Sequence, residues 1–200
     1  MPNVALIAGP LVDLASAAAA LAAAIGLQVV SAGNVCREHV QHQTPLGEEA
    51  KRYMQAGHLV PDELVVRAVA DALANVDSGW VLYNFPLKIR QTESLAQSGH
   101  VPDAVIELVL TEDQLRAATH SRVERRIELD PPQAERRQEL LLMYSHSQKN
   151  YQEQVDPLRA YYRTHGLWQA ASGFGDVDAV AAGLITIVSR SSSPPVRPAG

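Results

Sequence analysis

The first stretch of the chain that could do chemistry follows the apolar run 3–8. Gly9 comes directly after this run, and an alanine-rich segment follows it. A strand, a glycine and then a helix form the arrangement in which backbone N–H groups hold a phosphate. Such a site also needs a lysine against the phosphate charge and a hydroxyl that reaches Mg²⁺. The first lysine of the chain is Lys51, and Asp13 adds a negative charge to the loop. The residue types of this loop and of the alanine-rich segment therefore favour packing over phosphate binding.

Other reactive side chains form weaker patterns. His39 and His42 could share a helical face, but no third ligand has a suitable spacing, so we expect no metal site. Cys36 has no nearby His/Asp arrangement and is interpreted as a packing residue rather than a nucleophile. A basic cluster is interpreted mainly as a solvated helix face; it consists of Arg122, Arg125 and Arg126.

Composition narrows the class of protein. The 200 residues are 46% hydrophobic and 20% charged, which is typical of a globular protein with one domain, expected over 1–190. The net charge of −5 argues against a nucleic-acid partner. The run 14–25 is too short and too weakly apolar for a membrane span, and no basic residue precedes it as in a signal peptide. A single cysteine indicates the cytoplasm or another reducing compartment. The Ser/Pro-rich tail 191–200 is predicted to be disordered.

The elements that must position these residues alternate along the chain. Short apolar runs predict five buried strands, at 3–8, 27–31, 79–84, 104–110 and 167–171. Helical patterns lie between them, at 15–24, 61–76, 135–166 and 176–190. The pattern at 135–166 predicts two helices that meet near Asp156-Pro157, and Asp176 or Asp178 is expected to cap the last helix. This alternation predicts an α/β fold on a parallel sheet, with an inserted subdomain near 31–66.

Three motifs in this order identify a family resemblance: "SAGNVCRE" (31–38), "TPLGEEAKRYMQAGHLVPDELVV" (44–66) and "NFPLKIRQTESL" (84–95). Together they resemble the adenylate kinase family of nucleoside monophosphate kinases. The resemblance implies a P-loop NTPase-like three-layer fold with a five-stranded parallel sheet. It also implies a helical insertion at about 31–66 that binds the nucleoside monophosphate (NMP) and a short lid at about 122–132. The family transfers a phosphoryl group from ATP to AMP, giving two ADP, with Mg²⁺.

The first loop departs from the family pattern. That pattern is similar to Gly-Pro-Pro-Gly-x-Gly-Lys-Gly-Thr, of which Gly9 and Pro10 match. Leu14 stands at the last loop glycine, Ala15 at the lysine and Ala17 at the hydroxyl residue. The resemblance therefore implies a degenerate P-loop that has lost its ligands for ATP and Mg²⁺.

Further family positions carry other residue types here. The acidic residue associated with Mg²⁺-bound water corresponds to Tyr83, and the arginine that holds the acceptor phosphate corresponds to Leu87. The aspartate of the Ser-Thr-Gly-Asp turn corresponds to Asn34. Of two lid arginines the first corresponds to Ala118, and a later arginine aligns with Ser147 if no gap intervenes. The sequence leaves open whether a nearby arginine takes the place of a lost one; the candidates are Arg125, Arg126, Arg136 and Arg137.

A second set of positions keeps the family residue. Arg37 matches the arginine on the acceptor phosphate, and Gln91 matches the glutamine that reads the acceptor base. Gly57, Leu59 and Val60 match the wall around that base. Arg122 matches the second lid arginine. The alternative for 44–66 is that its Pro and Gly residues only shape the insertion.

Three functions follow as expectations. The first is a catalytically inactive pseudoenzyme that acts as a structural or regulatory module on protein partners or in a larger assembly, with no cofactor. The second is an active kinase with an atypical donor site, which would use Mg-ATP. The third is a sensor that binds AMP weakly through Arg37 and Gln91.

Overall fold

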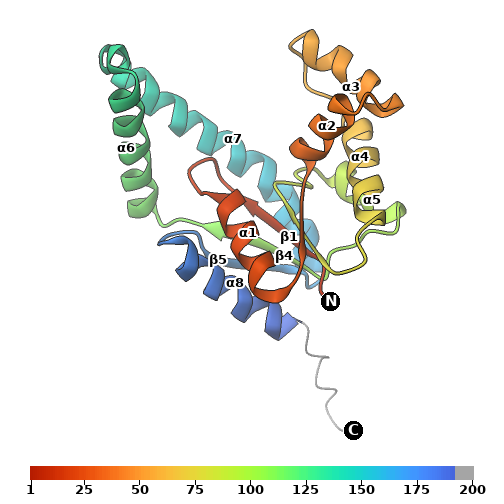
Figure 1. The fold of residues 1–200 in the computed structure, drawn as a ribbon. Helices are drawn as coiled ribbons and strands as arrows, with labels where there is room; N and C mark the ends of the chain where they lie inside the picture. Colours follow the sequence, from red (N-terminus) through yellow and green to blue (C-terminus); the bar gives the residue numbers. More distant parts are fainter. Residues whose placement is uncertain (192–200) are drawn as a thin grey trace, which may run out of the picture.

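The computed structural model describes residues 1–191, which form an α/β fold around one parallel sheet (Figure 1). The strands are β1 (Val4–Ala8), β2 (Gln28–Ser31), β3 (Trp80–Tyr83), β4 (Ala104–Val109) and β5 (Trp168–Ser172). Their order in the sheet is β2-β3-β1-β4-β5, and every pair is parallel. The predicted five-stranded parallel sheet of a P-loop NTPase-like fold is therefore confirmed.

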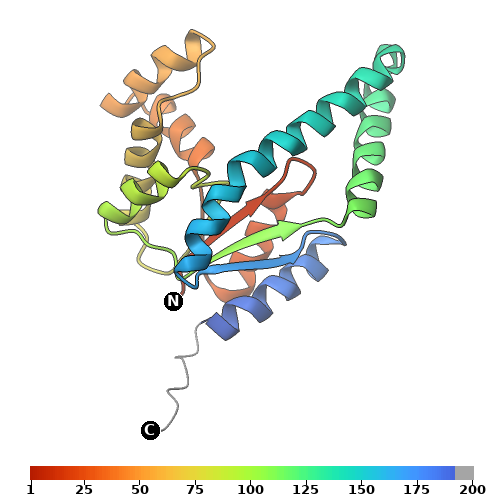
Figure 2. The same ribbon diagram turned by 180° about the vertical axis from the view of Figure 1, so that it is seen from behind.

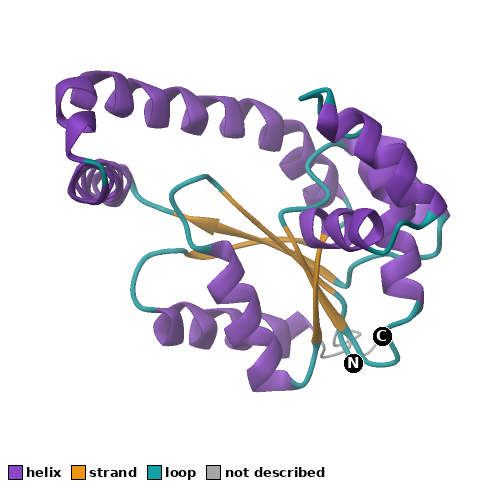
Figure 3. Cartoon of the chain, turned by 45° about the horizontal axis from the view of Figure 1, so that its top comes forward, coloured by secondary structure: helices purple, strands orange, loops and turns teal. Residues whose placement is uncertain are grey.

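Helices cover both faces of the sheet and produce three layers (Figure 3). Alternate residues of β1 point to opposite faces. Val4 and Leu6 face a core shared with α1 (Leu14–Ile25) and α8 (Val177–Ser191), whereas Ala5 and Ile7 face α7 (Arg137–Thr164). All five residues of β1 are buried, and this strand is the middle one of the sheet. The loop that follows it therefore begins at the centre of the molecule.

The two edge strands differ from the prediction that all five strands are buried. β2 has one buried residue, Val30, and β5 has none. Each edge strand has one neighbouring strand, and therefore one side that is not covered by the sheet. The prediction of burial was wrong for these two strands because apolar composition does not show where in the sheet a strand lies.

The alanine-rich segment forms the predicted helix α1. Asp13 caps its N-terminus, and Gly26 ends it with φ 72°, a left-handed conformation that glycine adopts without strain. Ala17, Ala18 and Leu21 pack into the core below the sheet. In α8, the Asp176 carboxylate accepts a hydrogen bond from the N–H of Ala179 at 2.8 Å, which confirms the first of its two predicted caps.

The insertion consists of short helices packed beside β2 and β3. They are α2 (Ala32–Gln41), α3 (Pro45–Gln55) and the start of α4 (Asp62–Ala74), and α5 (Ile89–Gln97) lies against α4. Thr44 caps α3 by accepting from the N–H of Gly47 at 3.1 Å. A Cβ on Gly47 would overlap the backbone carbonyl of His39, so only glycine lets α3 pack this closely on α2. This contact explains part of the 44–66 motif by shape alone.

Two helices extend from the opposite side of the sheet. They are α6 (Glu112–Leu129) and α7, joined by the short 3₁₀ helix Pro131–Arg136. The α6–α7 hairpin and the insertion rise on opposite sides of the edge where the strands end (Figures 1 and 2). The first loop lies at this edge, between the two projections.

The segment predicted as two helices is one helix. α7 continues through Pro157 to Thr164. Proline removes one helical hydrogen bond, but Val155, Leu158 and Tyr162 are buried against β1 and β4 on both sides of it. The prediction was wrong because this tertiary packing outweighs the local effect of proline.

The predicted disordered tail, 191–200, lies almost wholly outside the described residues, since α8 ends at Ser191. Within residues 1–191, no helix is both long enough and apolar enough to cross a bilayer.

Candidate functional site

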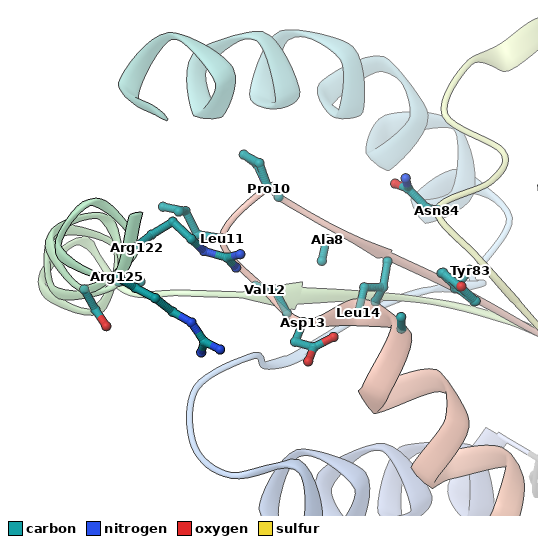
Figure 4. Close-up of a pocket in the computed structure, with 14 residues that line it drawn as sticks. Ala8, Pro10, Leu11, Val12, Asp13, Leu14, Tyr83, Asn84, Arg122 and Arg125 are labelled. Atoms are coloured by element: carbon teal, nitrogen blue, oxygen red, sulfur yellow. The ribbon is translucent and has the colours of Figure 1, made fainter. Parts of the chain in front are cut away.

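A cavity of about 860 Å³ opens at the carboxyl edge of the sheet (Figure 4). The loop after β1, the end of β3 and α6 each contribute to its lining. We call it the donor cavity, because it lies at the loop after β1, which resembles a degenerate P-loop. Its lining residues are Ala8, Gly9, Pro10, Leu11, Val12, Asp13, Leu14, Ala15, Tyr83, Asn84, Ala118, Ser121, Arg122 and Arg125.

Asp13 places its own carboxylate at the N-terminus of α1. Its Oδ2 accepts from the Ser16 hydroxyl at 2.8 Å, and its Oδ1 accepts from the Ser16 N–H at 3.2 Å. These hydrogen bonds, with a smaller contribution from the charge of Arg122, lower the pKa of Asp13 below its usual value. A negative charge therefore already lies at the helix end where an anion would otherwise be favoured.

Several N–H groups of the loop and of the first turn of α1 donate within this segment. Val12 N–H donates to Gly9 O at 3.2 Å, and Leu14 N–H donates to Val12 O at 3.0 Å. Ala17 N–H donates to Asp13 O at 3.2 Å. With Ser16 N–H on the Asp13 carboxylate, four N–H groups in the turn between Gly9 and Ala17 have an internal acceptor. These four groups are not available to a phosphate in the present conformation of the loop.

The positive charge in the donor cavity comes from α6. Arg122 and Arg125 lie on one face of the helix with Ala118 and Ser121, and all four line the cavity. Figure 4 shows both guanidinium groups reaching from α6 toward the loop that carries Asp13. Arg122, Arg125 and Arg126 are exposed, as expected of a solvated helix face, and helical spacing turns the first two toward the loop as well.

A second cavity, of about 360 Å³, adjoins the donor cavity on the side of α8. The two cavities share Leu11, Val12, Asp13 and Ala118. Ala17, the residue at the family's hydroxyl position, lies at its wall and is only 2% exposed. The loop after β5 also lines it through Gly173, Phe174 and Gly175.

The side of the donor cavity toward β3 carries no carboxylate. Tyr83 ends β3 and Asn84 follows it, and both line the cavity. Asn84 N–H donates to Leu6 O at 2.8 Å, which holds this turn against β1. Within residues 1–191, no group of three or more His, Cys, Asp and Glu side chains is arranged to hold a metal ion.

On the acceptor side, Arg37 and Asn34 lie together on α2. The Arg37 guanidinium donates to Asn34 Oδ1, and both residues are exposed. Arg37 does not line the donor cavity. Gly57 follows α3 with φ 71°, Leu59 is 92% exposed and Val60 is half-buried.

Gln91, which the resemblance assigned to the acceptor base, is buried rather than solvated. Its Oε1 accepts from the Leu87 N–H at 2.8 Å, and its Nε2 donates to Asp62 at 2.6 Å. Asp62 also accepts from Lys88 Nζ at 2.8 Å. Burial alone would raise the pKa of Asp62, but the hydrogen bonds from Lys88 and Gln91 lower it overall. Gln91 thus joins α5 to α4.

The remaining candidates lie apart from the donor cavity. Leu87 is half-buried against the core beneath α7, and Ser147 is half-buried on α7. Arg136 pairs with Glu139 at 2.8 Å, and Arg137 pairs with Glu124, where α6 meets α7. Arg126 is exposed in the last turn of α6.

The side chains of Cys36 and His39 contribute to the packing of the insertion rather than to a cavity. Cys36 is buried in the core beneath the insertion, and burial raises the pKa of its thiol, as expected of a packing residue. His39 Nδ1 lies 2.8 Å from the Thr44 hydroxyl in the α2–α3 turn.

Sequence reasoning missed three features of the site. Ser121 was not considered, although it shares a helical face with Ala118 and Arg122. The contribution of Phe174 was missed because no local pattern links the loop after β5 to the loop after β1. The partnership of Gln91 with Asp62 spans 29 positions and has no local signal either.

Comparisons with known proteins agree with the geometry. A family model described as adenylate kinase matches residues 7–167. An adenylate kinase of Beijerinckia indica is 35% identical over 80% of this chain and 84% of its own length. An adenylate kinase of Thermobifida fusca is 32% identical over 92% of this chain and 96% of its own length. Adenylate kinase 1 of Synechocystis is 32% identical over 86% and 88% of the two chains.

Proposed function

The chain belongs to the adenylate kinase family, and from this premise we propose that it is a catalytically inactive member that acts as a structural or regulatory module. The observation that carries the proposal is the capping of α1 by Asp13. Its carboxylate accepts from the N–H and the hydroxyl of Ser16, at the helix end where a loop of this kind would hold a phosphate.

Two further observations support the loss of the donor site. The residues that face the cavity at positions 14 and 15 are Leu and Ala, so no lysine opposes a phosphate charge there. The hydrogen bonds of Val12 N–H to Gly9 O and of Leu14 N–H to Val12 O occupy two N–H groups of the loop that would otherwise be free to donate to a phosphate. The donor cavity does not fit Mg-ATP as it stands, and we derive no catalytic step through it.

The size of the loss can be estimated. Phosphoryl transfer depends on positioning and on charge stabilisation, because the protein contributes little covalent chemistry. Removing one preorganised charge-stabilising group costs about 10²–10³ in rate. With several such groups replaced, we expect turnover at least about 10⁴-fold below that of an active relative, although such effects do not add. Arg122 and Arg125 supply cations to the cavity but no backbone donors.

A coupled assay of ADP formation from ATP, AMP and Mg²⁺ tests the proposal on the full chain. One of the adenylate kinase relatives compared above serves as the positive control under identical conditions. We expect no activity above about 10⁻⁴ of the control rate. Turnover within tenfold of the control would establish the alternative of an active kinase with an atypical donor site, in which Arg122 and Arg125 do the work of the missing lysine.

The third function, AMP sensing, has one favourable observation. Arg37 is exposed on the insertion, where it could reach a monophosphate. One charge-assisted hydrogen bond to phosphate contributes about 1.5–3 kcal/mol, so a site that keeps one arginine of two loses about 10- to 150-fold in affinity. Calorimetry with AMP therefore separates the alternatives: millimolar binding that Arg37→Ala abolishes supports a sensor, and no binding at millimolar AMP supports a purely structural role.

We propose that the chain lies in the cytoplasm or another reducing compartment, in keeping with its one free thiol, Cys36, which is buried. The structural or regulatory role also requires protein partners. Size-exclusion chromatography of the tagged chain from its own cells checks this part. A stoichiometric complex is expected, and elution as the free chain would contradict it.

A further inference from the structure

One face of α6 lines the donor cavity and then continues beyond it to the end of the helix. Ala118, Arg122 and Arg125 follow one another on this face at helical spacing, and all three line the cavity. The next position at the same spacing is Leu129, the last residue of α6, which is 79% exposed. We call this row of side chains the cavity face of α6.

Little of α6 is buried by the rest of the chain. Of its 18 residues, Val123 alone is buried among those that the structure describes. The helix ends at the point of the α6–α7 hairpin that lies farthest from the sheet (Figures 1 and 2). At a rise of 1.5 Å per residue, Leu129 lies about 10 Å beyond Arg122 along the helix. Leu129 therefore cannot enter the donor cavity of its own chain.

The charged side chains of α6 fall into two groups. Those of the first group pair within the chain: Arg116 lies 3.3 Å from Glu112, and Glu124 pairs with Arg137 of α7. The second group forms no ion pair with any residue of the described part of the chain, 1–191; it consists of Arg122, Arg125, Arg126 and Glu128. The unpaired charges thus gather in the outer half of the helix.

The end of the hairpin carries charge opposite to that of the donor cavity. Glu128 and Asp130 precede and follow Leu129, and both are exposed. Asp130 accepts a hydrogen bond from Gln133 at 2.8 Å, but within residues 1–191 neither carboxylate pairs with a cation. We call residues 128–130 the hairpin tip. It presents one apolar side chain between two carboxylates.

The cavity face and the hairpin tip are complementary to a second copy of themselves in the antiparallel orientation. The pair Arg125 and Glu128 and the pair Arg122 and Asp130 are both centred near position 126. A two-fold axis at this position would bring each tip opposite the arginines of the other copy. Both copies then make the same contacts, as in the isologous interface of a symmetric dimer.

The same register places an apolar side chain at the donor cavity. Leu129 of one copy would lie between Arg122 and Arg125 of the other copy, on the face that looks toward the loop after β1. The apolar lining of the cavity includes Pro10, Leu11 and Ala118. A single exposed leucine is ordinary on a protein surface. Here, however, its two acidic neighbours match the two unpaired arginines of the cavity.

We propose that two copies of this chain associate through the cavity faces of α6, each placing Leu129 in the donor cavity of the other. Glu128 pairs with Arg125 of the second copy, and Asp130 pairs with Arg122. This inference rests on the proposed function, because a donor cavity that held Mg-ATP would have no room for the hairpin tip. It identifies one partner of the structural module as a second copy of the same chain.

Sedimentation velocity of the full chain without nucleotide tests the association. We expect a reversible equilibrium of monomer and dimer between about 1 and 100 µM, the range of a modest interface. About 1 M NaCl should weaken it, because salt screens exposed charges. A chain that stays monomeric up to about 100 µM overturns the inference. The coupled assay of ADP formation tests inactivity separately, so the two proposals can fail independently.

Reversal of the charges assigns the contact to these residues. One variant combines Arg122→Glu with Arg125→Glu, and the other combines Glu128→Arg with Asp130→Arg. Each variant alone brings like charges together and should dimerise at least about 100-fold more weakly. An equimolar mixture of the two variants restores opposite charges in both contacts and should form a heterodimer. A mixture that stays monomeric, or a variant that dimerises alone as well as the native chain, overturns the contact.

The matched control reverses two exposed cations of α7 that lie outside the cavity face. Lys149→Glu combined with Arg163→Glu changes the net charge by the same amount as the first variant and should leave dimerisation unchanged. Loss of the dimer in this control would show that net charge, rather than the cavity face, governs association, and would overturn the inference. The concentration series on the unmodified chain stands even if a variant does not fold.

Discussion

Asp13 shows how a single side chain can decide what a helix N-terminus does. Its carboxylate satisfies Ser16 at the start of α1. Replacing such a cap by alanine costs about 1 kcal/mol, so Asp13→Ala should lower the free energy of unfolding by that amount at pH 7, measured by urea unfolding. Asp13→Asn keeps a capping oxygen and should cost much less, which makes it the matched control.

The pH dependence of the same variant follows from the lowered pKa of Asp13. A carboxyl group with a pKa below its unfolded value stabilises the fold above that value, near 3.8. The contribution disappears as the pH falls through the folded pKa. The difference in unfolding free energy between the native chain and Asp13→Ala should therefore stay constant from pH 7 to about pH 5 and shrink below about pH 4. A difference that grows toward low pH would contradict this assignment.

Glu107 and Arg159 form the other residue pair with a clear energetic consequence. Glu107 is 2% exposed and accepts from Arg159 and from the Tyr151 hydroxyl, at 2.9 and 3.0 Å on Oε1. Arg159→Met leaves this carboxylate buried without its cation and should lower the free energy of unfolding by about 3–5 kcal/mol. The double variant Glu107→Gln with Arg159→Met should recover part of that loss in urea unfolding. A single variant as stable as the native chain would show that the pair is not coupled.

At the scale of elements, substitution of Gly47 tests whether the 44–66 motif is needed for the packing of α3 on α2. Gly47→Ala places a Cβ against the carbonyl of His39, so α2 and α3 must separate. Overpacking of this kind costs about 1–3 kcal/mol, and hydrogen exchange should become faster in α2 and α3 while β1 and β4 stay protected. Gly183→Ala on α8, where a Cβ meets nothing within 4 Å, is the control and should not destabilise. Unchanged exchange in Gly47→Ala would mean that the motif is not needed for packing.

The elements also show what local patterns predict. The five strands, helix α1 and the cap at Asp176 follow from apolar runs, propensity and capping chemistry, all of which are local. The uninterrupted course of α7 through Pro157 could not be predicted, because it depends on Val155 and Leu158 packing against strands more than 40 positions away. The same limit applies to the site: the sequence identified the first loop, but the bonds of Gln91 to Asp62 join distant segments.

At the scale of the whole molecule, the loop and the core depend on one another. If the chain is inactive as proposed, this limits how far substitutions in the loop can introduce kinase activity. Leu14→Gly with Ala15→Lys and Ala17→Thr rebuilds part of the family motif. Leu14 and Ala17 are buried in the core beneath the sheet, at 8% and 2% exposure, so these changes disturb packing as well as the loop. Loss of a buried leucine alone costs about 2–5 kcal/mol.

We therefore expect the triple variant to unfold at lower urea and to show little turnover in the coupled assay. Asp13 would still cap α1, and Ala118 would still supply no charge to the cavity. Ala15→Lys alone is the informative control, because Ala15 is exposed in the donor cavity and a lysine there adds the cation without touching the core. If Ala15→Lys alone turned over at about 10 s⁻¹, an ordinary enzymatic rate, the loop lysine would be the one decisive loss. The internal bonds of the loop and the Asp13 carboxylate would then not prevent nucleotide binding, and Asp13 could no longer be the observation that carries the proposed inactivity.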